Sequence, residues 1–221
     1  MKILNTLDVF SKSSSLLDVG AGYGLFSSLA FDMGYKVTSL EPYLKMEKVR
    51  ENLNIQKIES TLEDYTNSKP NNRYGIVALL DVLEHTNDLN KTIDDVSNLL
   101  DKKGVLIIQV PNYRSMIARL SKNWAWWMVR DHNYHFSSKS IKKLLELHKF
   151  KILHMTSYEG LYEMKKNLDG NFTDISNKYL RKLIKAIKFM IFFPGYLVVR
   201  YLIWKIFFGG GLILVIAQKK K

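Results

Sequence analysis

Cysteine is absent from the 221 residues of this chain, and proline is scarce, at four residues. Without cysteine the chain can have neither a disulfide framework nor a thiolate metal site or a cysteine nucleophile. Hydrophobic residues make up 47% of the chain, which argues against disorder. The length suits one domain with a full core. The apolar stretch at the N-terminus is too short for a secretory signal, and an acidic residue, Asp8, occurs too early in it. A cytoplasmic location is therefore expected.

Acidic residues are nearly missing from the C-terminal part of the chain. Residues 171–221 contain ten Lys or Arg and one acid, Asp174, so they carry +9 of the formal net charge of +12. No uncharged run there reaches the ~18 to 20 residues of a membrane-spanning helix. A cationic C-terminal segment therefore follows a nearly neutral core.

Three alternating glycines follow a short apolar run near the N-terminus. Residues 16–26 are L-L-D-V-G-A-G-Y-G-L-F, in which Gly20, Gly22 and Gly24 precede a segment that favours a helix. The pattern predicts a strand, a tight turn and a helix. Glycines let a ligand approach the backbone closely, and the helix N-terminus offers free N–H groups. The motif alone also fits a purely structural turn.

Two acidic residues narrow the choice of ligand. Glu41 ends the next apolar run, about 20 residues past the glycines, where an acid can accept hydrogen bonds from both hydroxyls of a ribose. Asp18 stands two residues before the first glycine. A carboxylate there would repel the pyrophosphate of NAD, whereas it suits a ligand with an ammonium group. The pair favours S-adenosylmethionine over a dinucleotide.

Five motifs, in order, resemble those of one family. They are L-D-V-G-A-G-Y-G, L-E-P, T-L-E-D, A-L-L-D-V-L-E-H and G-V-L-I-I-Q-V-P-N. This order is similar to that of class I S-adenosylmethionine-dependent methyltransferases, in the branch that includes ubiquinone-pathway O-methyltransferases and many small-molecule and sugar methyltransferases. The resemblance covers about residues 16–153 and recurs at 211–218. It implies the fold and the cofactor and leaves the methyl acceptor open.

Alternating strands and helices predict an α/β fold with a Rossmann-like, mostly parallel sheet of seven strands. Strands are expected at 15–19, 36–40, 55–59, 74–80, 104–110, 150–158 and 212–217. Helices are expected at 2–11, 24–33, 43–51, 89–100 and after Ser137 or Ser138, one of which would N-cap the last helix. The last strand is expected to be antiparallel and to follow a helical insertion. Ligands of such sheets bind beyond the carboxyl ends of the strands.

The insertion divides the chain into two expected parts. Residues 1–170 and 209–221 would form the methyltransferase domain, and residues 171–208 a basic, apolar helical insertion. At 178–191 apolar residues recur at i, i+3 and i+4 with Lys or Arg between them, as in a basic amphipathic helix. Such a helix either lies in a membrane interface or packs on protein. A membrane surface is thus one candidate partner, through residues 178–208, and would make the protein peripheral on the inner face of the membrane.

The resemblance also implies which residues bind the cofactor, and most of them follow a strand. They are Asp18, Gly20, Ala21, Gly22, Gly24, Glu41, Pro42, Leu62, Glu63, Leu80 and Asp81. Asp18 would orient the methionine amino group, and Glu41 would bind the ribose. The backbone around Leu62 and Glu63 would face the adenine, although a solvated N-capping cluster is the alternative for these side chains.

Three histidines are candidates for removing a proton from the acceptor. His85 ends D-V-L-E-H, and His132 and His135 lie in R-D-H-N-Y-H-F-S, which resembles the segment that commonly lines the acceptor pocket of this family. The ordinary pKa of histidine is close to neutral, which suits a general base. Alternatively, Glu84 and His85 only cap and fix a loop.

The segment D-V-L-E-H raises a further hypothesis, a divalent metal ion. In ubiquinone-type O-methyltransferases a matching acid-x-x-E-H has been linked to such an ion, which here would bring together Asp81, Glu84 and His85. Helical spacing would place the three side chains on one face. The first acid is Asp instead of Glu, one methylene shorter, so the sequence favours a site without a metal.

The leading hypothesis is methyl transfer from S-adenosylmethionine to an oxygen of a small-molecule, sugar or lipid-linked acceptor. The protein would mainly align the reactants and remove one proton. A nucleic-acid methyltransferase or RNA-binding protein is the first alternative, because basic faces neutralise phosphates. Two features argue against it: the basic residues alternate with apolar ones, and the fourth strand lacks the N/D-P-P-Y type of ending. The second alternative is a non-catalytic, membrane-peripheral module with the same fold.

Overall fold

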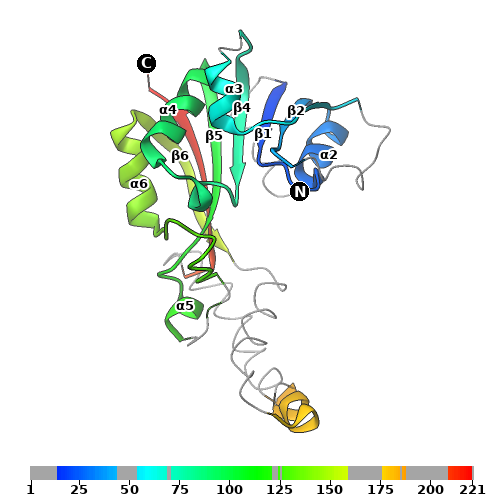
Figure 1. Ribbon diagram of the computed structural model, residues 1–221. Helices are drawn as coiled ribbons and strands as arrows, with labels where there is room; N and C mark the ends of the chain where they lie inside the picture. Colours follow the sequence, from blue (N-terminus) through cyan, green and yellow to red (C-terminus); the bar gives the residue numbers. More distant parts are fainter. Residues whose placement is uncertain are drawn as a thin grey trace.

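A seven-stranded sheet forms the centre of the computed structural model, which describes residues 14–43, 54–68, 71–120, 124, 126–158, 176–184, 186–187 and 209–220 (Figure 1). The strands are β1 (Ser15–Val19), β2 (Lys36–Leu40), β3 (Gln56–Ile58), β4 (Tyr74–Leu80), β5 (Leu100–Pro111), β6 (Phe150–Tyr158) and β7 (Leu212–Lys219). Their order is β3-β2-β1-β4-β5-β7-β6. Neighbouring strands are parallel except at β7, which is antiparallel to β5 and β6. The predicted mostly parallel sheet with an antiparallel last strand is confirmed.

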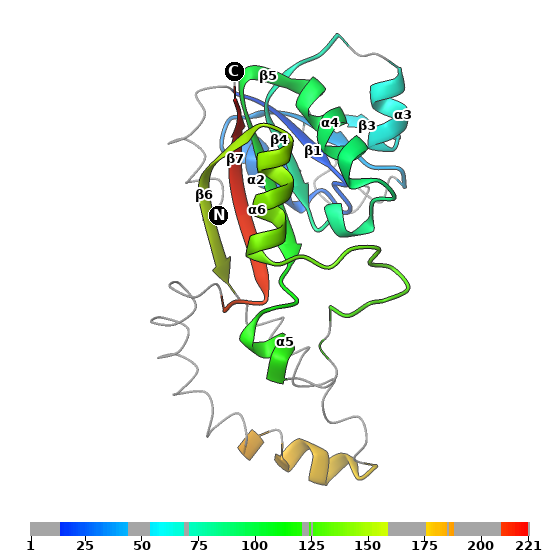
Figure 2. The same ribbon diagram turned by 90° about the vertical axis from the view of Figure 1, so that its left-hand side faces the viewer.

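The strands are apolar along most of their length because helices cover both faces of the sheet. The helices are α2 (Leu25–Asp32), α3 (Leu62–Asn67), the 3-10 helix η2 (Leu83–His85), α4 (Leu89–Leu99), α5 (Met116–Leu120) and α6 (Ser138–Leu147). In β4, Val77 and Leu79 pack in the core under α4 and α6, whereas Ile76 and Ala78 pack in the core under α2. Figures 1 and 2 show α4 and α6 on the face opposite α2. Burial on both faces explains why these strands appear as continuous apolar runs.

The strand order reverses between β1 and β4. β1 pairs with β2 on one side and with β4 on the other, so the chain continues from it in opposite directions across the sheet. A crevice forms at such a switch point, outside the carboxyl ends of the strands. β1, β2 and β4 end there at Val19, Leu40 and Leu80, next to residues that the sequence analysis assigned to the cofactor.

Four strands, β1, β2, β4 and β6, begin and end where the sequence predicts. β5 begins earlier, at Leu100, because Leu100 pairs with Tyr74 before an irregularity in the β4–β5 register. Two helices, α3 and α5, were not predicted. They have six and five residues, too few to show a helical period in the sequence.

Several expected elements lie outside the described residues, among them the helices at 2–11 and 43–51. Within the insertion, residues 178–184 and 186–187 are helical. No helix in the described ranges combines the length and the apolar character needed to cross a bilayer. The division of the chain into a methyltransferase domain and a separate insertion therefore stays a prediction.

Ser137 is the residue that N-caps α6. Its hydroxyl accepts a hydrogen bond from the Ser140 N–H, and the Ser140 hydroxyl accepts one from the Ser137 N–H. We expect Ser137→Ala to lower the free energy of unfolding by about 1 kcal/mol, because the Ser140 N–H at the helix end loses its acceptor. Ser138→Ala, one residue on, is the matched control and should cost less. Urea unfolding measures both, and equal losses would contradict this assignment.

Candidate cofactor and acceptor site

A cavity of about 610 Å³ lies beyond the carboxyl ends of β1, β2 and β4. It is lined by Val19, Gly20, Leu40, Glu41, Pro42, Ser60, Thr61, Leu62, Glu63, Asp81, Val82, His85, Thr86, Asn87, Asp88, Lys91, Thr92 and Asp95. The lining includes six residues expected to bind the cofactor, together with His85. The cavity therefore lies where both the strand order and the sequence motifs place a ligand.

The glycine turn is open to the cavity because it carries almost no side chains. Gly20 has a φ of 67°, and a Cβ atom there would lie 2.5 Å from Cγ2 of Val82. The N–H groups of Gly20 and Ala21 both donate to the Leu40 carbonyl, at 2.8 and 3.2 Å. Gly24 occupies the N-cap position of α2. The turn is thus fixed to the end of β2, and only glycine fits at its first position.

Glu41 faces this turn. Its Oε2 accepts a hydrogen bond of 2.8 Å from the Gly22 N–H, and its Oε1 accepts one of 3.2 Å from the Tyr43 N–H. The Glu41 carboxylate is therefore held at the cavity wall, at the end of β2. This is the acidic residue that the sequence predicts for ribose binding. The ribose contact itself stays a prediction.

Asp18 is not part of the cavity wall. It is 2% exposed, and its Oδ2 accepts a hydrogen bond of 2.5 Å from the hydroxyl of Ser27, which also contacts the Ser39 hydroxyl at 2.7 Å. Burial raises the pKa of Asp18 to about 7, although the bonds from Ser27 act in the opposite direction. In this structure Asp18 ties α2 to β1 and β2 instead of reaching toward a ligand. The contact with the methionine amino group stays a prediction.

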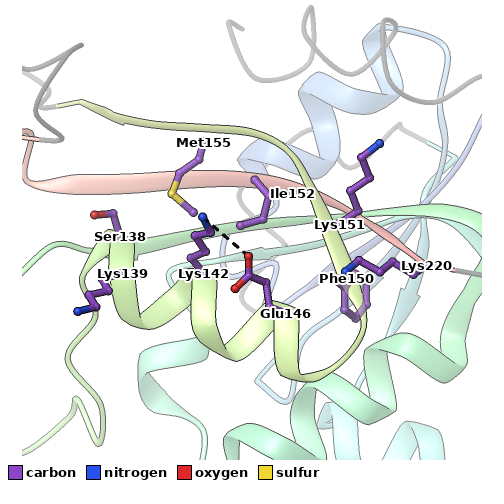
Figure 3. A pocket seen from close by; sticks show the side chains of 9 residues that line it. All are labelled: Ser138, Lys139, Lys142, Glu146, Phe150, Lys151, Ile152, Met155 and Lys220. Atoms are coloured by element: carbon purple, nitrogen blue, oxygen red, sulfur yellow. Dashed lines mark ion pairs between the residues drawn. The ribbon is translucent and has the colours of Figure 1, made fainter.

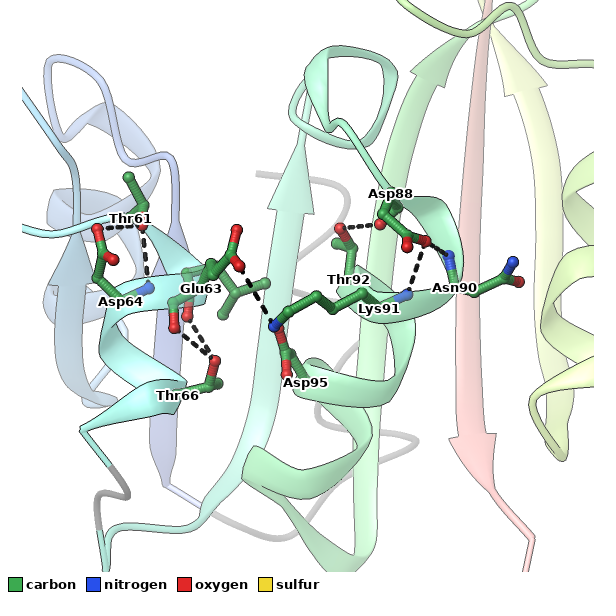
Figure 4. Close-up of polar contacts among 10 residues, drawn as sticks. Thr61, Glu63, Asp64, Thr66, Asp88, Asn90, Lys91, Thr92 and Asp95 are labelled. Carbon is green, nitrogen blue, oxygen red and sulfur yellow. Dashed lines mark hydrogen bonds and ion pairs between the residues drawn. The ribbon is translucent and has the colours of Figure 1, made fainter.

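The helices α3 and α4 provide another wall of the cavity. Nζ of Lys91 lies 2.9 Å from Oδ2 of Asp95 and 3.8 Å from Oε1 of Glu63, so it bridges the two helices (Figure 4). Thr61 N-caps α3 by accepting from the Asp64 N–H at 3.1 Å. Thr61 therefore has the N-capping role that was the alternative prediction for this segment. The side chain of Glu63 instead contacts Lys91.

No sequence-based prediction places α4 at this wall. Asp88 caps α4 by accepting from the N–H groups of Asn90 and Lys91, at 2.9 and 3.0 Å. An Asp directly before a helical segment is a signal for a helix N-terminus, and it could have located this wall.

Asp81 does not join Glu84 and His85, contrary to the arrangement that helical spacing predicted. Its φ is 56°, a left-handed conformation, and η2 begins only at Leu83. Its Oδ2 instead accepts a hydrogen bond of 2.9 Å from Nε2 of Gln109. Oε1 of the same Gln109 amide accepts a hydrogen bond from the Tyr158 hydroxyl. The backbone turn at Asp81 thus directs its side chain toward the ends of β5 and β6.

Glu84 and His85 lie instead with His132, and the possible ligand atoms of the three residues are all within 4.8 Å of one another. Nδ1 of His85 is 2.7 Å from the Asp131 carbonyl, and Nδ1 of His132 is 3.1 Å from the Trp126 carbonyl. A carbonyl oxygen only accepts hydrogen bonds, so both Nδ1 atoms are donors. The neutral rings therefore keep a lone pair on Nε2.

Burial favours the uncharged forms of Glu84 and His132 in this cluster. Glu84 is 1% exposed, and its Oε2 has no hydrogen-bond partner among the residues that the structure describes. Burial, with a smaller effect of Asp81, raises the pKa of Glu84 to about 8. Burial and the neighbouring His85 lower the pKa of His132. One carboxylate oxygen and two imidazole nitrogens form a set of donors that fits a divalent transition metal ion.

The third predicted histidine, His135, lies behind this cluster. Its ring centroid is 6.1 Å from that of His132 and 5.2 Å from that of Trp127. The segment is held against η2, since the Asn133 N–H donates to the Glu84 carbonyl at 2.8 Å. Of the three predicted histidines, only His85 lines the cavity.

A second cavity, of about 620 Å³, lies between α6 and β6 (Figure 3). It is lined by Ser138, Lys139, Lys142, Glu146, Phe150, Lys151, Ile152, Met155 and Lys220. None of the cofactor motifs contributes to it, and four of its residues are lysines. It is therefore separate from the candidate site.

The fold and the site together define a nucleoside-binding α/β protein, with a glycine turn and an acidic residue at the switch point of the sheet. A family described as "Methyltransferase domain" matches residues 2–155, about two thirds of the chain. The chain therefore belongs to this methyltransferase family, as a class I S-adenosylmethionine-dependent enzyme.

Similar proteins agree with this assignment. The ubiquinone biosynthesis O-methyltransferase of Pelagibacter ubique is 25% identical over 185 residues, which cover 79% of this chain and 76% of that protein. The protein of the same name from Rickettsia typhi is 22% identical, covering 78% and 76%. A SAM-dependent methyltransferase structure from Archaeoglobus fulgidus has a TM-score of 0.65 at 17% identity, covering 99% of this chain and 91% of that one.

A structure with bound S-adenosylhomocysteine has the same fold. It is 1,6-didemethyltoxoflavin-N1-methyltransferase from Burkholderia thailandensis, with a TM-score of 0.60 at 13% identity, covering 100% of this chain and 76% of that one.

We expect Gly20→Ala to weaken the binding of S-adenosylhomocysteine at least about tenfold, because the added Cβ would meet Val82 and displace the turn. Gly34→Ala is the matched control: Gly34 also has a positive φ, of 89°, but no atom of the described residues lies within 4 Å of its added Cβ. Both variants should lose some stability, and only the first should lose affinity in calorimetry. Equal affinity of the two variants would contradict the site.

The raised pKa of Asp18 makes its contribution to stability depend on pH. The unfolded carboxyl loses its proton near pH 4, whereas the folded one keeps it up to about pH 7. The contribution of Asp18 to the free energy of unfolding should therefore fall between these values and stay level above them. In Asp18→Asn this fall is absent. The free energy of unfolding of the variant, relative to that of the wild type, should therefore rise by at most about 4 kcal/mol over this pH range. Urea unfolding at several pH values tests this, and a pH-independent difference would refute it.

Proposed function

We propose that the protein transfers the methyl group of S-adenosylmethionine to a hydroxyl oxygen of a small-molecule acceptor, with His85 as the general base. The main support is the position of His85, which lines the same cavity as Gly20 and Glu41. Its ring is fixed by the Asp131 carbonyl, which leaves Nε2 as the acceptor of a proton.

The chain's own residues would bind and align the two reactants. Glu41 would accept hydrogen bonds from the ribose hydroxyls, and the backbone at Leu62 and Glu63 would face the adenine. The cofactor supplies a methyl group that its sulfonium already activates. An in-line displacement then needs the acceptor oxygen in position and one proton removed, and Nε2 of His85 would take that proton.

His132 and His135 would act indirectly. His132 is 6% exposed and meets the ring of His85 edge to face, with centroids 4.7 Å apart. Its lowered pKa keeps it neutral at physiological pH, so it positions His85 without adding a repelling charge. This arrangement favours His85 over its two rivals as the base.

The charge of the cavity bears on the acceptor. Five residues that line the cavity are acidic, and Lys91 is the one lysine or arginine in that lining. Acids repel the phosphates of a nucleic acid and attract a sulfonium cation. This distribution argues against the nucleic-acid alternative. The names of the ubiquinone biosynthesis O-methyltransferases support oxygen as the acceptor atom, and a sugar or a lipid-linked hydroxyl fits the same chemistry.

We expect His85→Gln to lower kcat for methyl transfer about 10²- to 10⁴-fold without changing the affinity for S-adenosylhomocysteine. His148→Gln is the matched control, since His148 pairs with Asp94 and Asn90 away from the cavity. Transfer of a labelled methyl group to phenolic, sugar, amine and RNA acceptors tests the role of His85 and also identifies the class of acceptor. Full activity of His85→Gln would refute the base, and methylation of RNA alone would refute the acceptor.

Glu84, His85 and His132 also support an alternative to the general base, in which a divalent metal ion, with His85 as one of its ligands, would activate the acceptor in place of proton removal by His85. Bound there, the ion would supply a Lewis acid beside the acceptor. We expect Mn²⁺ or Zn²⁺ to bind the wild type in calorimetry, and the affinity to fall at least about tenfold in His132→Gln. His135→Gln, whose side chain lies outside the ligand set, should bind the ion as the wild type does. Equal affinity of the two variants would exclude His132 as a ligand.

A further inference from the structure

A short helix between β6 and β7 stands apart from the sheet. Residues 178–184 and 186–187 are helical, and we refer to them as the outer helix. Figures 1 and 2 both show it beyond the edge at which the parallel strands end, farther from the sheet than α5. The candidate site opens at this same edge.

One face of the outer helix is apolar and open. Leu180, Leu183, Ile184 and Ile187 follow the i, i+3, i+4, i+7 spacing of a single helical face. Leu180, Leu183 and Ile187 are 49%, 57% and 42% exposed. An apolar face of this kind normally packs on a core. Here, within the described part of the chain, about half of its surface stays accessible.

The remaining faces of the outer helix are basic. Lys178, Arg181 and Lys182 lie between the apolar positions, and residues 178–187 contain no acid. Tyr179, at 84% exposed, adds a ring with an apolar body and a polar tip. Apolar residues on one side, Lys and Arg on the other and an aromatic between them are typical of helices that lie in a membrane interface.

The charge pattern favours an anionic bilayer over a second copy of the chain. A second copy would bring the same basic helix to the contact, and like charges would oppose pairing. Anionic headgroups pair with Lys and Arg while the acyl boundary accepts the apolar face. The nine helical residues that the structure describes span about 14 Å, less than half of the ~30 Å hydrocarbon core, and no helix of the described residues meets the length for crossing a bilayer, so we infer that the outer helix lies on its surface.

We propose that the outer helix docks this protein on an anionic lipid surface. Leu180, Leu183 and Ile187 enter the acyl boundary, and Lys178 and Arg181 contact the headgroups. Docking in this way directs the strand-end edge of the sheet, with its cavity, toward the bilayer. The inference goes beyond methyl transfer and does not depend on it.

Co-sedimentation of the full chain with vesicles tests the proposal. We expect binding to phosphatidylcholine vesicles that contain phosphatidylglycerol, little binding to pure phosphatidylcholine, and a decrease as salt rises. The triple variant Lys178→Glu, Arg181→Glu, Lys182→Glu should lose about 100-fold or more in partition coefficient. The triple variant Leu180→Ser, Leu183→Ser, Ile187→Ser should lose binding even at low salt, because the apolar area is removed.

A charge-matched control separates a docking helix from general basicity. Lys139→Glu, Lys142→Glu, Lys151→Glu makes the same change in charge at the α6–β6 cavity (Figure 3) and should leave vesicle binding near that of the wild type. Equal loss in this control, or wild-type binding by the serine variant, would overturn the proposal. So would a lipid-free dimer that the serine variant converts to monomer. Calorimetry with S-adenosylhomocysteine checks that each variant is folded, independently of vesicle binding.

Discussion

The site depends on the contact between the carboxyl ends of β1 and β2. The N–H groups of Gly20 and Ala21 share the Leu40 carbonyl, and the Gly22 N–H donates to Glu41. These backbone bonds make the glycine turn a fixed rim and place the acid beside it. Val82, just after β4, packs so close to Gly20 that a side chain at Gly20 has no room. The wall offered to a nucleoside is therefore backbone, held in place by three adjacent strand ends.

Local sequence patterns are sufficient to predict the strands and the edge of the sheet at which the site lies. β2 and β4 are apolar runs between polar or turn-forming residues, and both have the predicted bounds. Gly20, Glu41 and Asp81 all line the cavity because each directly follows a parallel strand, and parallel strands end at one edge. Spacing along the chain thus carries the information for this part of the site.

The rest of the site depends on contacts between distant segments and on single backbone angles. His132 meets His85 because hydrogen bonds from Asn133 hold a loop against η2, and no periodic pattern indicates that contact. The positive φ of Asp81 separates it from Glu84, although the residues are three apart. The distance of Asp18 from the glycines predicts that it lies at the ligand, and that contact stays a prediction. In this structure the Asp18 carboxylate accepts a hydrogen bond from the Ser27 hydroxyl, a tertiary contact that no local pattern indicates.

Net charge and local charge indicate different partners. The whole chain carries +12, which by itself favours a polyanion such as nucleic acid. The cavity wall has the opposite sign, with acids at Glu41, Glu63, Asp81, Asp88 and Asp95. Much of the positive charge lies in the C-terminal part of the chain, including the outer helix. An acidic cavity and a basic helix toward the same end of the sheet would let a cationic cofactor and the proposed anionic surface bind without competing, because each would be repelled from the other's site.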